Sequence, residues 1–172
     1  MLKYIYRDLL SMIRFLPWGL MMGAAVSAVF LWAGNRRRRK GVQQAQVLPV
    51  TAFCIYLSVM LIITFLSRES GSGQSLVDLE IFSTWGINDR NNAFVVENVL
   101  LFLPYGFLAS WAFKRMRRFW NCTLLGAVTS LGIESLQLIT ARGYFQIDDI
   151  LTNTLGTVIG YLVYWLLFYK KR

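Results

Sequence analysis

The sequence predicts an all-α protein, a polytopic membrane helix bundle with about five transmembrane helices. Hydrophobic residues make up 56% of the 172 positions, which is too apolar for a water-soluble domain. The chain also contains five long apolar stretches, each close to the ~20 residues with which a helix crosses ~30 Å of hydrocarbon. Basic residues gather in short segments beside these stretches. No second domain is visible, so we expect residues 1–172 to form a single integral-membrane domain.

The five apolar stretches are the predicted spans, at about residues 15–33, 47–66, 94–113, 119–140 and 150–169. Pro17 and Pro49 lie near the starts of the first two spans, where a helix does not need the N–H that proline lacks. In the third span, Pro104 is expected to break the helix. Residues 1–14 carry apolar side chains at helical spacing, and we expect either a short interfacial helix there or an extension of the first span.

The basic residues predict the orientation. Twelve of the eighteen Lys and Arg residues lie in segments 36–40, 114–118 and 170–172, which fall on one side of the membrane if there are five spans. Because cytoplasmic loops retain positive charge, the N-terminus is predicted outside and the C-terminus in the cytoplasm. All nine acids map to the opposite side or to the span ends that face it. A site built from carboxylates should therefore lie at the outer face.

The composition also bears on the kind of function. A net charge of +9 favours nucleic-acid binding in a soluble protein, but here the basic residues flank apolar spans and no recognition fold is visible, so no nucleic acid is expected. The absence of histidine removes the usual general base and the usual zinc ligand. Cys54 and Cys122 lie inside apolar stretches and are expected to be packing residues without a disulfide.

Polar residues inside the predicted spans mark the candidate site, because each ionisable group there costs roughly 2.5–3.5 kcal/mol on insertion scales. Helical spacing places Gly126, Ser130, Glu134 and Gln137 on one stripe of the fourth span. It places Asp149, Asn153, Gly156 and Gly160 on one stripe of the fifth, where the two glycines should permit close helix packing. These two faces are expected to meet. The candidate ligand-binding residues are Glu97, Asn98, Glu134, Gln137, Arg142, Asp148, Asp149 and Asn153.

Within this cluster, Glu134 and Asp149 are the candidate catalytic or metal-holding residues, and a divalent cation such as Mg²⁺ is the cofactor that carboxylates would suit. Arg142 is expected to be the counter-ion, since the short loop between the last two spans tethers it near the acids. Two structural alternatives stay open. The polar groups form a hydrogen-bonded network that only locks three helices together, or Asp148 simply caps the last helix. Tyr144 is expected either to line a cleft or to anchor the chain at the membrane interface.

The order of these residues resembles that of a known family. The segment Asn98-Val99-Leu100-Leu101-Phe102-Leu103-Pro104-Tyr105-Gly106 is followed by Ser130, Glu134, Gln137, Arg142, Asp148, Asp149, Asn153, Gly156 and Gly160. Over about residues 98–161, this pattern resembles the VanZ-like, or teicoplanin-resistance, family. The resemblance implies a multi-pass protein of the bacterial plasma membrane that is linked to low-level resistance to lipidated glycopeptides. Gln146 departs from the pattern, because the family often has a further acid there.

Two functions compete at this point. In the first, the cluster binds or shields a membrane lipid or lipid-linked cell-wall component in an outer-leaflet polar cleft, or excludes the lipid tail of a teicoplanin-type antibiotic. In the second, the protein is an enzyme acting on a lipid phosphate, with a cation held by Glu134 and Asp149 and an anionic group contacted by Arg142. A transporter has less support, because the sequence contains no inverted repeat.

Overall fold

The computed structural model describes residues 1–37, 47–66 and 77–169, and it is helical almost throughout. Five of the described helices are long and apolar enough to cross a membrane, as predicted. The helices are α1 (Leu2–Met12), α2 (Leu16–Arg37), α3 (Val47–Leu66), α4 (Asp89–Ala112), α5 (Phe119–Ile139) and α6 (Ile147–Tyr164), and α6 continues into a π-helical turn, Trp165–Tyr169. The observed ends lie within a few residues of the predicted spans, except that α4 begins five residues earlier.

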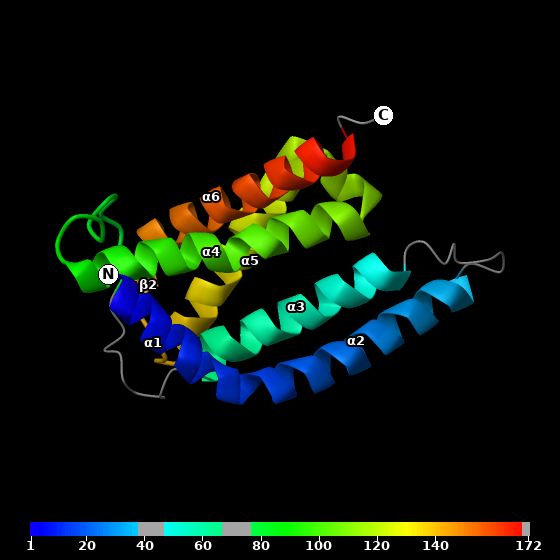
Figure 1. The fold of residues 1–172 in the computed structure, drawn as a ribbon, viewed down its shortest axis with the longest axis horizontal. Coiled ribbons are helices and arrows are strands. Elements are labelled where there is room, and N and C mark those ends of the chain that lie inside the picture. Colours follow the sequence, from blue (N-terminus) through cyan, green and yellow to red (C-terminus); the bar gives the residue numbers. More distant parts are fainter. Residues whose placement is uncertain (38–46, 67–76, 170–172) are drawn as a thin grey trace.

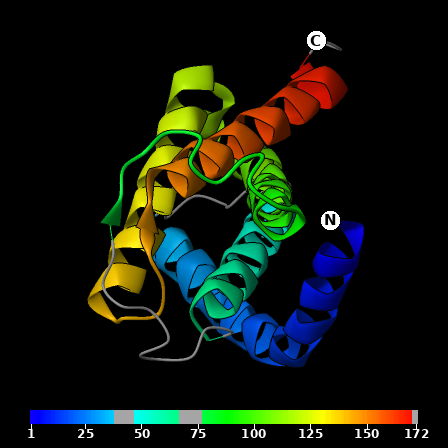
Figure 2. The same cartoon turned by 90° about the vertical axis from the view of Figure 1, so that its left-hand side faces the viewer.

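The N-terminal segment forms a helix of its own. The 3-10 turn Ile13–Phe15 separates α1 from α2, and the two helices point in different directions (Figure 2). Asp8 of α1 pairs with Arg90 in the first turn of α4, where an Arg90 Nη1 lies 2.6 Å from an Asp8 carboxylate oxygen. This ion pair holds α1 beside the start of α4. The expected interfacial placement of α1 stays a prediction.

The long helices form two groups (Figure 1). Helices α2 and α3 pack side by side, and α4 and α6 pack together above them in that view, with α5 behind and packed against α6. Gly19 and Gly23 explain the close approach of α2 to α3, because a Cβ at either position would overlap Val59 or Ile55. This agrees with the packing role that small residues take between membrane helices.

The apolar core joins the two groups. Phe53 and Met60 of α3 are buried against Phe102 and Tyr105 of α4. The rings of Phe53 and Tyr105 have centroids 5.4 Å apart and are tilted by 47°, which is a favourable aromatic arrangement. Both cysteines are free and buried, as expected for packing residues.

Helices α4 and α6 approach each other closely because glycine lines their contact. A Cβ at Gly156 would overlap the carbonyl oxygen of Val99, and one at Gly160 would overlap that of Leu103. On α4, a Cβ at Gly106 would overlap the carbonyl oxygen of Thr157. The backbones of α4 and α6 therefore touch without intervening side chains, which brings the buried polar residues of α6 close to α4.

The expected break at Pro104 does not occur, because α4 runs continuously from Asp89 to Ala112. Proline lacks the N–H that would bond the carbonyl four residues earlier, and its ring crowds that turn. In the same turn, the hydroxyl of Tyr56 on α3 donates to the Leu101 carbonyl oxygen at 2.6 Å. This bond from α3 lies one residue beyond the Leu100 carbonyl, which Pro104 leaves without its helical donor.

Two short strands, which the sequence analysis did not predict, join the loops at one end of the bundle. Strand β1 (Val77–Asp78) pairs in parallel with β2 (Phe145–Gln146), so Val77 lies opposite Phe145. We call this end the acid-rich end, since Asp8, Asp78, Glu80, Asp89, Asp148 and Asp149 lie there. The opposite end, with the 3-10 turn Lys114–Arg117 between α4 and α5, is the basic end.

Candidate functional site

Buried polar side chains follow the contact between α5 and α6, as the helical spacing predicts. Ser130, Glu134 and Gln137 are buried on α5, and Asp149 and Asn153 are buried on α6. The Asn153 amide nitrogen donates to the Ser130 hydroxyl at 2.9 Å, so the two predicted faces do meet. We call these five residues the polar stripe. It lies toward the acid-rich end of the bundle.

Two amide groups, those of Asn153 in the polar stripe and Asn98 on α4, each keep an unused hydrogen-bonding atom. Asn153 is only 4% exposed, yet its Oδ1 has no hydrogen-bond partner among the described residues. Exchanging the amide oxygen and nitrogen would leave the nitrogen unpaired instead, because Ser130 can either donate or accept. The Nδ2 of Asn98 on α4 is likewise buried without a partner in the described chain. Each of these two amides thus keeps one buried polar atom that no described protein group satisfies.

Glu134 links the polar stripe to the loop that precedes α6. One of its carboxylate oxygens accepts the backbone N–H of Gln146 at 3.2 Å, and the residue is only 2% exposed. Gln146 is the position at which the family resemblance led us to expect a further acid. Its backbone contributes here, so this bond does not depend on the identity of its side chain.

Asp148 is neither a helix cap nor a member of the polar stripe. The structure shows no side-chain capping bond at the start of α6. Instead, the Asp148 carboxylate accepts the backbone N–H groups of Phe82 and Thr84, at 2.7 Å and 2.9 Å. Its buried position therefore serves to hold the loop before α4. The sequence could not reveal this role, because the partners are backbone groups more than sixty residues away.

Glu97 faces a different part of the molecule. It lies seven residues after Arg90 on the same side of α4, and the charges that act on it are those of Asp8 and Arg90. Its Oε1 is buried without a hydrogen-bond partner among the described residues. The structure therefore associates Glu97 with the α1 side of the bundle.

Arg142 and Gln137 bind the end of α3. The Arg142 guanidinium donates to the Phe65 carbonyl oxygen at 2.9 Å, and the Gln137 amide donates to that of Thr64 at 3.2 Å. No ion pair between Arg142 and an acid occurs within residues 1–37, 47–66 and 77–169, so the expected counter-ion role is not seen there. The last carbonyls of a helix attract cations and donors, which explains the observed contacts.

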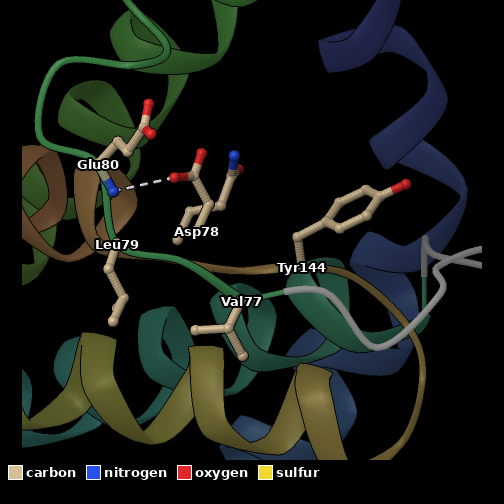
Figure 3. Close-up of a pocket in the computed structure, with 6 residues that line it drawn as sticks. Val77, Asp78, Leu79, Glu80 and Tyr144 are labelled. Carbon is tan, nitrogen blue, oxygen red and sulfur yellow. Dashed lines mark hydrogen bonds between the residues drawn. The ribbon is translucent and has the colours of Figure 1, made fainter.

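A hollow of about 570 Å³ opens beside β1 and β2 at the acid-rich end (Figure 3). It is lined by Val77, Asp78, Leu79, Glu80, Tyr144 and Gln146. Tyr144 thus lines a hollow, which is one of its two expected roles. The acids Asp78 and Glu80 were not among the predicted site residues, since they lie in a loop where charged residues carry no special signal.

Asp78 is fixed within this hollow. One carboxylate oxygen accepts the Glu80 backbone N–H at 3.0 Å, drawn as a dashed line in Figure 3, and the other accepts the Ser83 hydroxyl at 2.9 Å. These bonds, with the Glu80 N–H first, lower the pKa of the Asp78 carboxyl below its ordinary value of 3.8. The wall of the hollow therefore stays negatively charged at neutral pH.

The described residues contain no group of three or more Cys, Asp and Glu side chains placed to hold a metal ion. The pair Glu134 and Asp149 is the carboxylate set that the polar stripe offers. Carboxylate pairs do occur in Mg²⁺ sites, but there water and substrate phosphates complete the coordination.

Five apolar helices with a buried polar stripe toward one end define an integral membrane protein with a candidate polar site. The sequence model of the VanZ/LLP1 family matches residues 53–168, and the chain belongs to this family. The match extends beyond the expected core of 98–161 and includes most of α3. The chain is also 36% identical over 72 residues to Protein VanZ of Enterococcus faecium, covering 42% of this chain and 44% of that protein. No solved structure gives a significant match.

Proposed function

We propose that this protein acts in the bacterial plasma membrane and gives low-level resistance to teicoplanin-type glycopeptides by binding the polar head of a lipid-linked envelope component. Asn153 carries the proposal, because its amide is buried and keeps one unsatisfied polar atom. Such an atom costs about 1–3 kcal/mol unless it gains a partner. A ligand hydroxyl or amide that reaches it would recover that energy.

The surroundings of Asn153 support a polar ligand. Glu134 on α5 and Asp149 on α6 add carboxylates, and α4, which packs against α6, carries the unpaired Asn98 nitrogen. Together these groups suit a head group rich in hydroxyls and amides, such as a sugar or a peptide. The hollow at Asp78 and Tyr144 shares Gln146 with the site, since the Gln146 backbone bonds Glu134, and it gives room for a larger head.

Membership in the VanZ/LLP1 family and the likeness to Protein VanZ support the link to glycopeptide resistance. The predicted orientation supports an outer-leaflet site, because lipid-linked cell-wall components and the antibiotic meet on that side. A lipid-linked component that is bound or shielded at the polar stripe would then be kept away from the lipid tail of the antibiotic. Lipid II-type molecules match the required chemistry, with a sugar and peptide head on a polyprenyl phosphate.

The test is teicoplanin susceptibility in a sensitive Gram-positive host that expresses the protein. Glu134→Gln keeps the size of the side chain and an oxygen for the Gln146 N–H, and Asn153→Ala removes the unpaired amide. Both variants are expected to lose the resistance that the unaltered protein gives. Asp89→Asn is the matched control, because Asp89 is an acid at the same end with a side chain that is 75% exposed, and it should retain resistance.

Immunoblots of the membrane fraction must show equal amounts of all variants. Full resistance from Glu134→Gln and Asn153→Ala at equal amounts would refute a binding role of the polar stripe. The competing enzyme is tested separately, by incubating the purified protein with polyprenyl phosphates with and without Mg²⁺. Turnover that Glu134→Gln abolishes would replace binding by catalysis as the function.

A further inference from the structure

The basic end of the bundle contains a second hollow, of about 360 Å³, lined by Lys114, Arg115, Arg118 and Asn121. It lies at the turn where α4 ends and α5 begins. Its volume falls within the range of roughly 300–1,000 Å³ that small-molecule sites occupy. Nothing in the proposed function uses it.

The three cations of this hollow have no acidic partner in the part of the chain that the structure describes. The sequence explains this, because it contains no Asp or Glu between Asn98 and Ile133. Like charges held around one small space repel each other, and an anion in the hollow would remove that repulsion. The hollow therefore has the charge of an anion site.

Side chains from three helices fix the turn that carries these cations. The Asn121 amide of α5 donates to the Arg115 carbonyl at 2.9 Å, and the Ser110 hydroxyl of α4 donates to the Met116 carbonyl at 3.3 Å. The Tyr161 hydroxyl of α6 donates to the Arg117 carbonyl at 3.2 Å. Basic residues that only determine membrane orientation need no fixed arrangement. Here the fixed turn holds the three cations around one small space, as a binding site requires.

The N-terminus of α5 adds to the positive electrostatic potential at this hollow. Arg118 is the N-cap residue and makes no side-chain capping bond, and the first turn contains no acid. The first N–H groups of a helix lack intrahelical partners and carry the positive end of its dipole. These groups and the three cations belong to one short stretch of chain, so they favour the same anion.

We propose that this hollow binds the phosphate of an anionic phospholipid. Trp120, in the first turn of α5, is 77% exposed, and Phe119 beside it is also exposed. Exposed aromatic residues at the end of a span mark the depth of the lipid head groups. The hollow therefore lies where lipid phosphates are concentrated, and basic pockets between transmembrane helices on the predicted cytoplasmic side bind such heads.

The experiment is native mass spectrometry of the full chain, purified with equal amounts of phosphatidylglycerol and phosphatidylcholine. The unaltered protein should retain phosphatidylglycerol preferentially. The double variant R115Q/R118Q should lower that retention about tenfold, since each lost charge removes part of the attraction. R115K/R118K keeps both charges and should retain most of it. Equal retention of the two lipids, or retention unaffected by R115Q/R118Q, would overturn the proposal.

The matched control is K3Q/R14Q, which removes two exposed charges near the acid-rich end and should leave lipid retention unchanged. An equal loss in this control would mean that net charge alone attracts the lipid, which contradicts a defined site. Inorganic phosphate in about a hundredfold excess over the lipid should not displace it, and displacement would instead assign the hollow to a soluble phosphate. If R115Q/R118Q does not fold, the unaltered protein still gives a test. Raising the ammonium acetate concentration about tenfold should release phosphatidylglycerol from it. Retention that does not change with the salt concentration would contradict the proposal.

Discussion

Asp148 holds Phe82 across 66 residues of chain, through a 2.7 Å hydrogen bond from the Phe82 backbone N–H to its Oδ1. Phe82 has a φ of +65°, a conformation that a bulky side chain seldom adopts. Its side chain is 76% exposed. The energy of the strained backbone is offset by the charged acceptor, which also receives the N–H of Thr84 at 2.9 Å.

Asp148→Asn should therefore loosen this loop. An amide offers one oxygen where the carboxylate offers two, and its NH₂ group would face a backbone N–H. We expect the loop to lose about 1–3 kcal/mol of protection, because hydrogen bonds to charged groups have about that value. Hydrogen–deuterium exchange of residues 79–85 measures this loss. Asp89→Asn is the control. Equal exchange in the two variants would contradict the role of Asp148 in holding this loop.

Gly160→Ala should strongly destabilise the protein, because the new methyl group would overlap the Leu103 carbonyl oxygen, which is backbone and cannot turn aside. Overpacking of this kind typically costs about 1–3 kcal/mol. Thermal unfolding in detergent measures the effect. Gly132→Ala is the matched control, since a Cβ there meets nothing within 4 Å, and it should be neutral or stabilising. A Gly160→Ala protein as stable as the control would disprove the close contact of α4 and α6.

Tyr56→Phe should lower stability by about 1 kcal/mol through loss of the hydrogen bond to the Leu101 carbonyl. The ring stays in place, so apolar packing changes little. The same unfolding assay serves, with Tyr6→Phe on exposed α1 as the control that should have no effect. An unchanged unfolding temperature in Tyr56→Phe would mean that α4 needs no support at its proline turn.

Acidification should weaken the hydrogen bonds that fix Asp78 in the wall of the hollow. Its carboxyl has a lowered pKa in the folded protein, so the stability that its bonds contribute is fully present above its ordinary pKa of 3.8. That stability is lost as the pH falls through the lower, folded value. The ¹³C shift of the carboxyl, assigned with Asp78→Asn, should titrate below 3.8. Ser83→Ala removes one of the bonds and should raise the pKa toward its ordinary value, and a pKa unaffected by this change would contradict the observed contact.

The five spans could be predicted because a single physical requirement, apolar length, determines them. Helical spacing correctly predicted that Gly156 and Gly160 serve helix packing and that the faces of α5 and α6 meet. It did not identify α4 as the helix against which the two glycines pack. Pro104 shows where such reasoning ends. Proline weakens a helix locally, but whether it breaks the helix also depends on packing against neighbouring helices. Such contacts come from residues far away in the sequence, as the bond from Tyr56 to Leu101 does.

The candidate site was predictable only in part, for a related reason. Spacing along one helix identifies residues on a common face, so the polar stripe from Ser130 to Asn153 was correctly grouped. Chain proximity suggested that Arg142 pairs with acids, yet it binds a carbonyl at the end of α3. A sequence does not indicate which backbone N–H or C=O group a given side chain will bind. The loop clamp at Asp148 and the contact of Arg142 were hidden for that reason.

The glycine contact between α4 and α6 has a mechanical consequence. Carbonyl groups of each helix rest directly on glycines of the other, so neither helix can slide or rotate past its neighbour without a steric clash. We therefore expect α4 and α6 to move as one rigid unit. Under the proposed function, a movement that admits a ligand to the polar stripe is therefore expected in elements other than the α4–α6 pair, because that pair is locked by backbone contacts.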